Sequence, residues 1–287
     1  MSQLTYKHLM DAIHEYDMIL FDLWGVIIEG EETYLGVVDA VNEIMEKKRV
    51  VFLSNAPRPN FIVARNLNNR GLRNVGPDNV LTSGDIARRM VEERKLSIGK
   101  KSPLVYHLGA DRNDEILIEI EHELTEDIDK ADILLMSLYR DDHENINEFD
   151  DLLKKAAKST EMLTLCSNPD TTIPKHGVLR YCAGHFAGII EKFGGEVVYT
   201  GKPKSVIYDE VLKRNSTTKN DRILMVGYTF ETDILGANTA GIHSALVMTG
   251  NANNFHKMHN KIEDKLMALH DHAKEMKVMP TFVTKIV

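Results

Sequence analysis

Short apolar runs alternate with amphipathic stretches along the chain, and this alternation most strongly limits the folds that it can adopt. The runs Met18–Phe21, Val50–Leu53 and Ile223–Val226 are continuously apolar, as expected of strands that are buried on both faces. The stretch at residues 35–48, by contrast, carries apolar side chains at helical spacing. Strands that alternate with helices predict an α/β fold with a mainly parallel sheet.

The chain is long for one compact domain, since it has 287 residues. A second set of strands is predicted in its middle, at Leu104–Tyr106, Ile133–Met136 and Met162–Leu165. The first pattern then resumes, with a helix near residues 183–193 and a strand at Val197–Tyr199. We therefore expect a discontinuous core domain at residues 1–83 and 179–287, and an inserted α/β domain at residues 84–178.

Polar residues follow several predicted core strands at the point where each strand ends. Asp22 follows the first strand, Ser54 and Asn55 end the second, Lys202 follows a later strand, and Asp233 lies beyond the next. Ligands of open parallel sheets bind at this carboxyl edge. A carboxylate can attack phosphorus while a hydroxyl and a lysine hold the phosphoryl oxygens. The pattern predicts phosphoryl transfer through a covalent intermediate.

Two acidic side chains at one edge would repel each other without a cation between them. Their hard oxygen ligands indicate Mg²⁺, with Asp22 and Asp233 as candidate metal ligands. A structural alternative exists for each position. Asp22 could be a polar loop residue, while Ser54, Asn55 and Asp233 could cap the helices that follow them.

Four segments together resemble the signatures of the haloacid dehalogenase superfamily. The sequence ILFDLWGV at residues 19–26 is similar to the first signature and LSN at 53–55 to the second. GKP at 201–203 matches the third, and GYTFETDILGA at 227–237 resembles the fourth. Order and spacing agree over nearly the whole chain. The resemblance implies a Rossmann-like core, a nucleophile at Asp22, a phosphate-binding Lys202 and a bound Mg²⁺.

The predicted insert lies between the second and third signatures, with Asn168-Pro169-Asp170 near its end. This placement resembles the class IIA capped branch, which includes sugar-phosphate, nucleotide and pyridoxal-phosphate phosphatases. The resemblance implies a small phosphorylated metabolite as substrate, with Asn168 and Asp170 where such caps approach it. Members of the branch often dimerise through the cap, so a homodimer is an expected assembly.

Two acidic positions of the superfamily pattern are occupied by aromatic residues. Trp24 stands where the family has the Asp that acts as general acid and base, although its backbone carbonyl could still bind the metal. Tyr228 stands where the fourth signature has a metal-binding Asp, and a neutral phenol is a poor magnesium ligand. Glu231 is a candidate substitute for that ligand.

These substitutions leave more than one function open. The chain could be a slow or specialised phosphatase, or a pseudo-enzyme that binds a phosphorylated ligand without turnover. Cleavage of a carbon–halogen bond needs the Asp nucleophile and no metal, but the class IIA-type insert, Lys202 and Asp233 argue against it.

Other classes of function are disfavoured by the sequence. The net charge is −8 without a basic stripe, which argues against nucleic-acid binding. No apolar run approaches the roughly 20 residues of a membrane span, and the N-terminus lacks the layout of a signal peptide, so we expect a cytoplasmic protein. No GxGxxG or Walker A motif is present. Cys166 and Cys182 form no CxxC pattern and are expected to be reduced.

Overall fold

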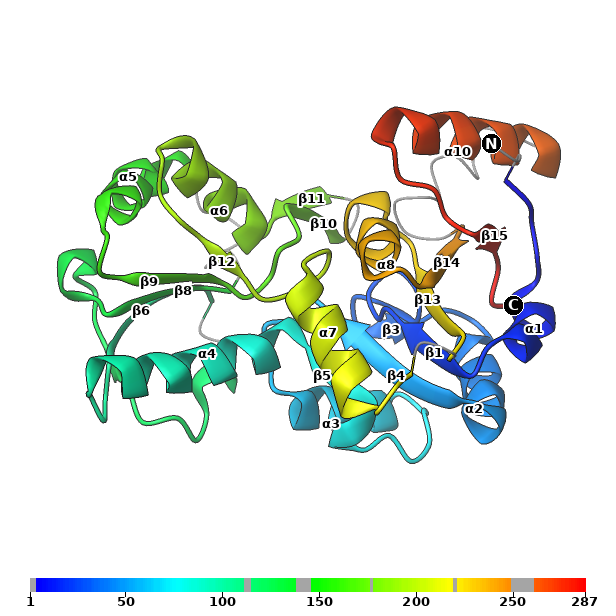
Figure 1. Cartoon of the computed structure of the whole chain (residues 1–287), viewed down its shortest axis with the longest axis horizontal. Helices are drawn as coiled ribbons and strands as arrows, with labels where there is room; N and C mark the ends of the chain where they lie inside the picture. The colour runs from blue at the N-terminus through cyan, green and yellow to red at the C-terminus, as the bar shows by residue number, and fades with distance from the viewer. Residues whose placement is uncertain (1–3, 111–114, 138–145, 176–177, 219–220, 249–260) are drawn as a thin grey trace. The chain divides into compact units, whose positions relative to one another are not determined.

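The computed structural model describes residues 4–110, 115–137, 146–175, 178–218, 221–248 and 261–287 (Figure 1). The chain divides into two compact units, and each has its own parallel sheet. The first unit consists of Met1–Ser54, Phe61–Leu81 and Lys202–Val287. The second unit consists of Asn55–Asn60 and Thr82–Gly201.

Within the described residues, the main sheet of the first unit has six strands. Their order is β15 (Phe282–Thr284), β14 (His243–Val247), β13 (Ile223–Gly227), β1 (Met18–Phe21), β4 (Arg49–Ser54) and β5 (Val80–Thr82). β1 pairs in parallel with both β13 and β4, so that Phe21 lies opposite Val226 and Phe52. The ends of these three strands therefore meet at one edge of the sheet.

Helices pack on the first sheet through two separate apolar clusters. One cluster joins Ala245 and Val247 to α1 (Leu9–Ala12), α2 (Val37–Lys47) and α3 (Asn60–Asn69). The other joins Leu246 to α10 (Ile262–Met276). Neighbouring residues of β14 thus enter different clusters, because side chains alternate across a strand. The unit also contains the hairpin of β2 (Ile28–Glu29) and β3 (Glu32–Thr33), together with α7 (Ser205–Arg214) and α8 (Leu235–Ala240).

The described part of the second unit has a five-stranded sheet in which the pairs are parallel. Its order is β12 (Val198–Tyr199), β9 (Leu163–Cys166), β8 (Ile133–Met136), β6 (Leu104–Leu108) and β7 (Glu123–Leu124). Ile133 and Leu135 pack with α4 (Ser83–Ile98), whereas Leu134 and Met136 pack with α5 (Asp150–Lys158) and α6 (Ala183–Lys192). A separate antiparallel hairpin joins β10 (Thr172–Lys175) to β11 (Val178–Tyr181).

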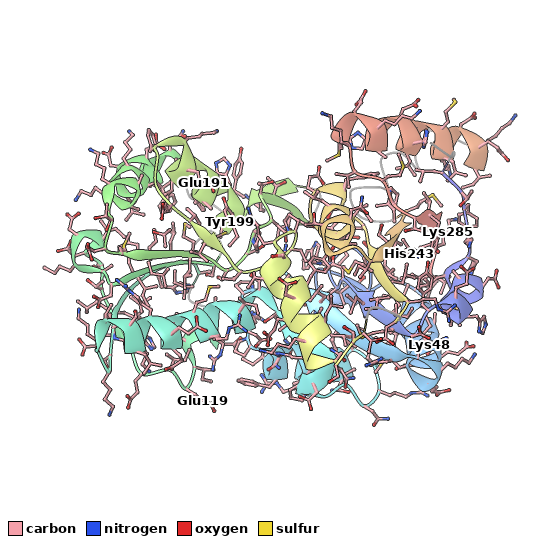
Figure 2. All side chains as sticks on the ribbon, viewed as in Figure 1. Lys48, Glu119, Glu191, Tyr199, His243 and Lys285 are labelled. Carbon is pink, nitrogen blue, oxygen red and sulfur yellow. The ribbon has the colours of Figure 1, made fainter. Side chains whose placement is uncertain are left out.

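The two parallel sheets with their helices confirm the predicted α/β fold. The boundary of the second unit differs from the predicted one, which ended at residue 178. β12 pairs with β9, and α6 packs on the same sheet. Tyr199 on β12 also donates a hydrogen bond of 2.8 Å to Glu191 on α6 (Figure 2). These contacts place the segment up to Gly201 in the second unit.

Among the helices that the structure describes, none has the length and apolar character needed to cross a membrane.

Candidate active site

Asp22 directly follows β1, and a backbone hydrogen bond and a tight turn fix its position. Its amide donates to Val226 O on the neighbouring β13 at 2.9 Å. The chain then turns at Gly25, whose φ of +77° favours glycine. Leu23 O accepts hydrogen bonds from the amides of Val26, Ile27 and Ile28, which closes the turn. The Asp22 residue is 6% exposed, so the position is largely buried.

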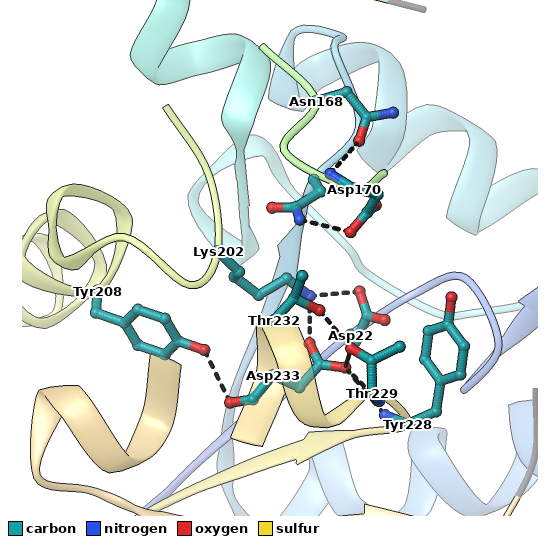
Figure 3. Close-up of polar contacts among 10 residues, drawn as sticks. Asp22, Asn168, Asp170, Lys202, Tyr208, Tyr228, Thr229, Thr232 and Asp233 are labelled. Carbon is teal, nitrogen blue, oxygen red and sulfur yellow. Dashed lines mark hydrogen bonds and ion pairs between the residues drawn. The ribbon is translucent and has the colours of Figure 1, made fainter. Parts of the chain in front are cut away.

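Lys202 lies between the two carboxylates that the sequence places at strand ends. Its Nζ donates to Asp22 Oδ1 and to Asp233 Oδ1, both at 2.7 Å (Figure 3). Burial acts to lower the pKa of Lys202, but the charges of Asp22 and Asp233 and their hydrogen bonds outweigh it and raise that pKa above its ordinary value. Lys202 is therefore a cation.

Asp233 is fully buried on a π-helical turn, η6 (Phe230–Ile234), which precedes α8. Its Oδ2 accepts hydrogen bonds from the amides of Tyr228 and Thr229, at 3.0 and 3.2 Å, and from the Thr229 hydroxyl at 3.2 Å. The hydroxyls of Thr229 and Thr232 are also hydrogen-bonded to each other. The carboxylate is thus held by Lys202 on one oxygen and by the turn on the other.

Gly227, the last residue of β13, allows Asp233 to approach the strand this closely. A Cβ atom at position 227 would lie 2.2 Å from Asp233 Cβ and 2.5 Å from its Oδ2. Atoms that are not bonded cannot come so near, so any other residue would displace the carboxylate.

Tyr208 holds the backbone of Asp233 from α7. It is fully buried, and its Oη donates to Asp233 O at 3.2 Å (Figure 3). Burial, with the charges of Asp233 and Asp22, raises the pKa of Tyr208 well above its ordinary value, so the group remains an O–H donor. Tyr208 and Thr229 were not among the site residues predicted from the sequence. The sequence signal that could have identified Tyr208 is a tyrosine on the buried face of a helix, because a buried tyrosine hydroxyl needs a hydrogen-bond partner.

The two substituted acidic positions are occupied by aromatic side chains that pack into the first unit. The Tyr228 residue is 7% exposed, and its ring lies against Gly25, where an added Cβ would be 2.8 Å from a ring carbon. Trp24 is partly buried and packs against the apolar cluster that joins β14 to α1, α2 and α3. Its Nε1 is buried and, within the described residues, has no hydrogen-bond partner. Glu231 is exposed on the π-helical turn, in contrast to the buried Asp233.

The other predicted site residues divide between the two units. Ser54 is buried at the end of β4, the strand next to β1 in the first unit. Asn55 belongs to the second unit, where its Nδ2 donates to Asp170 Oδ1 at 3.0 Å. The Asp170 amide in turn donates to Asn168 Oδ1 at 3.2 Å (Figure 3). The structure therefore brings Asn55, Asn168 and Asp170 together within the second unit.

The donor set of the first unit agrees with Mg²⁺ in kind but offers few carboxylates. Asp22 and Asp233 each present an oxygen to the same lysine ammonium, so the two side chains converge. Carboxylate and carbonyl oxygens are the ligands that Mg²⁺ prefers. No cluster of three or more acidic, histidine or cysteine side chains suited to a metal is found in the described part of the chain. The donors are therefore of the kind that Mg²⁺ prefers, but within the described residues they include only two carboxylates.

Two family models match the chain in the segments that build this site. One, described as haloacid dehalogenase-like hydrolase, matches residues 19–123. The other, described as HAD-hydrolase-like, matches residues 199–274. The matched segments contain Asp22, Ser54, Lys202 and Asp233.

Two curated phosphatases are similar to the chain. A D-glycerol 3-phosphate phosphatase of Mycobacterium tuberculosis is 26% identical over 82% of this chain. The match spans 64% of that relative, so the chain corresponds to less than two thirds of its length. Phosphoglycolate phosphatase 2 of Arabidopsis thaliana is 26% identical over 92% of both chains.

Solved structures share the fold over most of the chain. A haloacid dehalogenase-like hydrolase from Brucella suis is 28% identical, with a TM-score of 0.71 over 84% of this chain and 88% of that one. A protein from Cytophaga hutchinsonii, described as a possible sugar phosphatase of the same superfamily, is 22% identical, with a TM-score of 0.76 over 98% of this chain and 97% of that one. The glycerol phosphate phosphatase of Mycobacterium tuberculosis in complex with magnesium is 23% identical, with a TM-score of 0.62 over 82% and 68%.

Proposed function

The chain belongs to the haloacid dehalogenase superfamily of hydrolases, and on this premise we propose that it removes phosphate from a small phosphorylated metabolite through an aspartyl-phosphate at Asp22. The observation that carries the proposal is the contact of Lys202 with both Asp22 and Asp233 at 2.7 Å. This contact joins a nucleophile, a cation and a second carboxylate in one buried cluster.

The reaction has two steps at phosphorus. A carboxylate oxygen of Asp22 forms a bond to phosphorus while the bond to the leaving oxygen breaks. Lys202 and Ser54 bind the phosphoryl oxygens and offset their charge. Water then attacks phosphorus, which releases inorganic phosphate and regenerates the carboxylate. The leaving oxygen takes its proton from solvent or substrate, because the indole of Trp24 cannot donate one usefully.

We assign the metal position to Asp22, Asp233 and the backbone carbonyl of Trp24. When bound there, Mg²⁺ would offset the charge that develops on the phosphoryl group. The magnesium complex of the mycobacterial phosphatase supports a divalent metal in this fold. The exposed Glu231 is not included, and Tyr228 supplies a phenol in place of a carboxylate. We therefore expect weaker magnesium binding than a site with additional carboxylates would have.

Catalysis is proposed to be slow because Trp24 occupies the position of the proton-transfer residue. General acid–base help contributes roughly 10²–10⁴ in rate, so its loss is large but leaves the nucleophile and Lys202 in place. The named substrates of the curated relatives are small three-carbon or two-carbon phosphates, which favours a small metabolite here. Asn55, Asn168 and Asp170 are proposed to contact the part of the substrate beyond the phosphate.

A second candidate is a pseudo-phosphatase that binds a phosphorylated ligand without turnover. The observation that favours it is the packing of Trp24 and Tyr228, since both substituted positions are filled by aromatic rings instead of acids. This candidate predicts thermal stabilisation by a phosphorylated ligand in the absence of phosphate release.

Phosphate release from a broad panel of phosphorylated metabolites, with Mg²⁺, Mn²⁺ or Co²⁺, separates the two candidates. The phosphatase proposal predicts release from at least one compound, abolished in Asp22→Asn. Asp17→Asn is the matched control. Asp17 lies directly before the first residue of β1, at the end of the strand opposite to Asp22, and forms an ion pair with Arg222. A panel without release but with ligand-dependent stabilisation would favour the pseudo-phosphatase. A panel without either would reject both.

A further inference from the structure

Asp233 is held at its side chain and at its backbone by different parts of the first unit. Lys202 and the amides of Tyr228 and Thr229 hold the carboxylate. The backbone carbonyl of the same residue accepts a hydrogen bond from Tyr208 Oη at 3.2 Å. Since the other donors orient the carboxylate directly, the contact of Tyr208 with the carbonyl has a separate role.

We propose that Tyr208 is a positioning residue that fixes the π-helical turn and thereby directs the Asp233 carboxylate towards Lys202. The catalytic consequence rests on the proposed function, but the effect on the turn does not. Tyr208 contacts the carbonyl of Asp233 and not its carboxylate, so it acts through the backbone.

The turn that carries Asp233 is π-helical, and a hydrogen-bond donor from outside the turn can help to fix its backbone. Ile234 N bonds to Thr229 O, five residues earlier, which is the hydrogen bond of a π-helix. Such turns occur mostly as single turns within α-helices, frequently at functional sites. A fixed donor on the Asp233 carbonyl therefore limits the rotation of the peptide that carries the carboxylate.

Tyr208 is itself rigidly placed. It is fully buried, and its ring packs against Gly236 on α8, where an added Cβ would lie 2.4 Å from the ring. It also lies on α7, the helix that begins at Ser205 shortly after Lys202. Tyr208 thus connects the segment that carries Lys202 to the turn that carries Asp233. These two residues are the partners of one ion pair.

The test compares Tyr208→Phe with Tyr16→Phe by amide hydrogen exchange. Tyr16 is a matched control, because it is 3% exposed and its hydroxyl is hydrogen-bonded to His243 Nδ1 at 3.0 Å. Tyr16 precedes β1 and His243 begins β14, so this pair lies at the amino-terminal ends of the strands (Figure 2 labels His243). Both variants lose one buried hydroxyl and keep the ring.

In Tyr208→Phe, the hydrogen-exchange rates of the Tyr228 and Thr229 amides are expected to rise about threefold to tenfold more than the loss of global stability alone would cause. In Tyr16→Phe, the same two amides should change no more than the global stability requires. Equal changes in the two variants would overturn the proposal. If Tyr208→Phe does not fold, Gly236→Ala displaces the same ring and should raise exchange at the same amides, and unchanged exchange there would also overturn it.

Steady-state kinetics then separate this inference from the proposed function. With a substrate that the wild type hydrolyses, kcat of Tyr208→Phe is expected to fall about tenfold with little change in KM, as for other indirect supports of a site. The kcat of Tyr16→Phe should stay near that of the wild type. A wild type without any phosphate release would reject the proposed function, while the exchange comparison would still decide the role of Tyr208.

Discussion

Lys202 is buried between Asp22 and Asp233, and each carboxylate accepts a hydrogen bond of 2.7 Å from its ammonium group. Moving an ammonium group out of water is costly, and the nearby carboxylates offset that cost. At the residue scale, the site is therefore a buried cluster of one lysine and two carboxylates, and its geometry depends on close packing around Asp233.

The close contact of Gly227 with Asp233 gives a prediction at this scale. Gly227→Ala should push the carboxylate away from Lys202, because the new Cβ would lie 2.2 Å from Asp233 Cβ. We expect a loss of about 1–3 kcal/mol in the free energy of unfolding and a fall in kcat of at least tenfold. Chemical denaturation and phosphate release measure the two effects.

Gly188→Ala is the control for that substitution. Gly188 lies within α6, and an added Cβ there has, apart from its chain neighbours and the backbone of its own helix, no atom of the described residues within 4 Å. This change should raise stability slightly, by about 0.5–1 kcal/mol, since alanine favours a helix over glycine. If Gly227→Ala and Gly188→Ala changed the free energy of unfolding and kcat alike, the close contact at Gly227 would not be the reason that Asp233 keeps its position.

The residues that could be predicted from the sequence are those at strand ends. Asp22 and Asp233 follow β1 and β13, which are parallel neighbours, and such strands bring these positions to one edge of the sheet. Lys202 was also expected to follow a core strand, but the strand before it, β12, pairs with β9 in the second unit, and Lys202 still contacts both carboxylates. Tyr208 follows no strand, and its partner is a backbone carbonyl that carries no sequence signal. Its role depends on how α7 and α8 pack, which a pattern in one helix does not reveal.

At the scale of elements, Tyr16 joins the segment before β1 to the start of β14. Burial raises the pKa of Tyr16 from its ordinary value of 10.0 to about 12, with Glu15 adding to the shift. The folded state thus favours the neutral phenol. The resulting stabilisation is complete below pH 10, where Tyr16 is neutral in both states, and is lost as the pH rises towards 12.

Tyr16→Phe should therefore reduce the alkaline loss of stability. We expect the fall in the free energy of unfolding between pH 10 and pH 12 to be smaller in the variant by about 1–2 kcal/mol. Urea denaturation across that interval gives the measurement, with Tyr34→Phe as a control at a more exposed tyrosine that bonds to Glu29. An equally steep fall in Tyr16→Phe would show that Tyr16 does not titrate in this way.

Individual elements were predicted more accurately than their assignment to a sheet. The strand at Val197–Tyr199 was predicted in the core domain, but β12 pairs with β9 in the second unit. Both sheets are parallel, so their strands carry the same apolar signal, and only the pairing partner distinguishes them. The β10–β11 hairpin was not predicted, because Thr172–Lys175 contains a proline and reads as a loop.

At the scale of the whole molecule, each unit has apolar clusters of its own. Leu224 lies in a cluster of the first unit and Leu134 in one of the second, and both are fully buried. The first unit is assembled from three chain segments, and residues distant in sequence complete its sheet. Separate cores allow the units to differ in thermal stability.

Leu224→Ala and Leu134→Ala form a matched pair that tests this separation. Each should cost about 2–5 kcal/mol within its own unit. Scanning calorimetry of the full chain should then show Leu134→Ala lowering the transition of the second unit and Leu224→Ala that of the first. A single transition that both variants lower equally would mean that the two units unfold as one.

In the proposed reaction, Asp22 carries the phosphoryl group during turnover. Its most direct test is acid quenching of the enzyme during hydrolysis of p-nitrophenyl phosphate, followed by mass spectrometry of the peptide that contains Asp22. This substrate has a good leaving group, so the first step needs little acid catalysis, whereas hydrolysis of the intermediate lacks a base at Trp24. We predict one phosphoryl group on Asp22, in a larger fraction of wild-type enzyme than of Trp24→Asp. Continued phosphate release from an enzyme whose Asp22 is never modified would show that the reaction does not pass through an aspartyl-phosphate at Asp22.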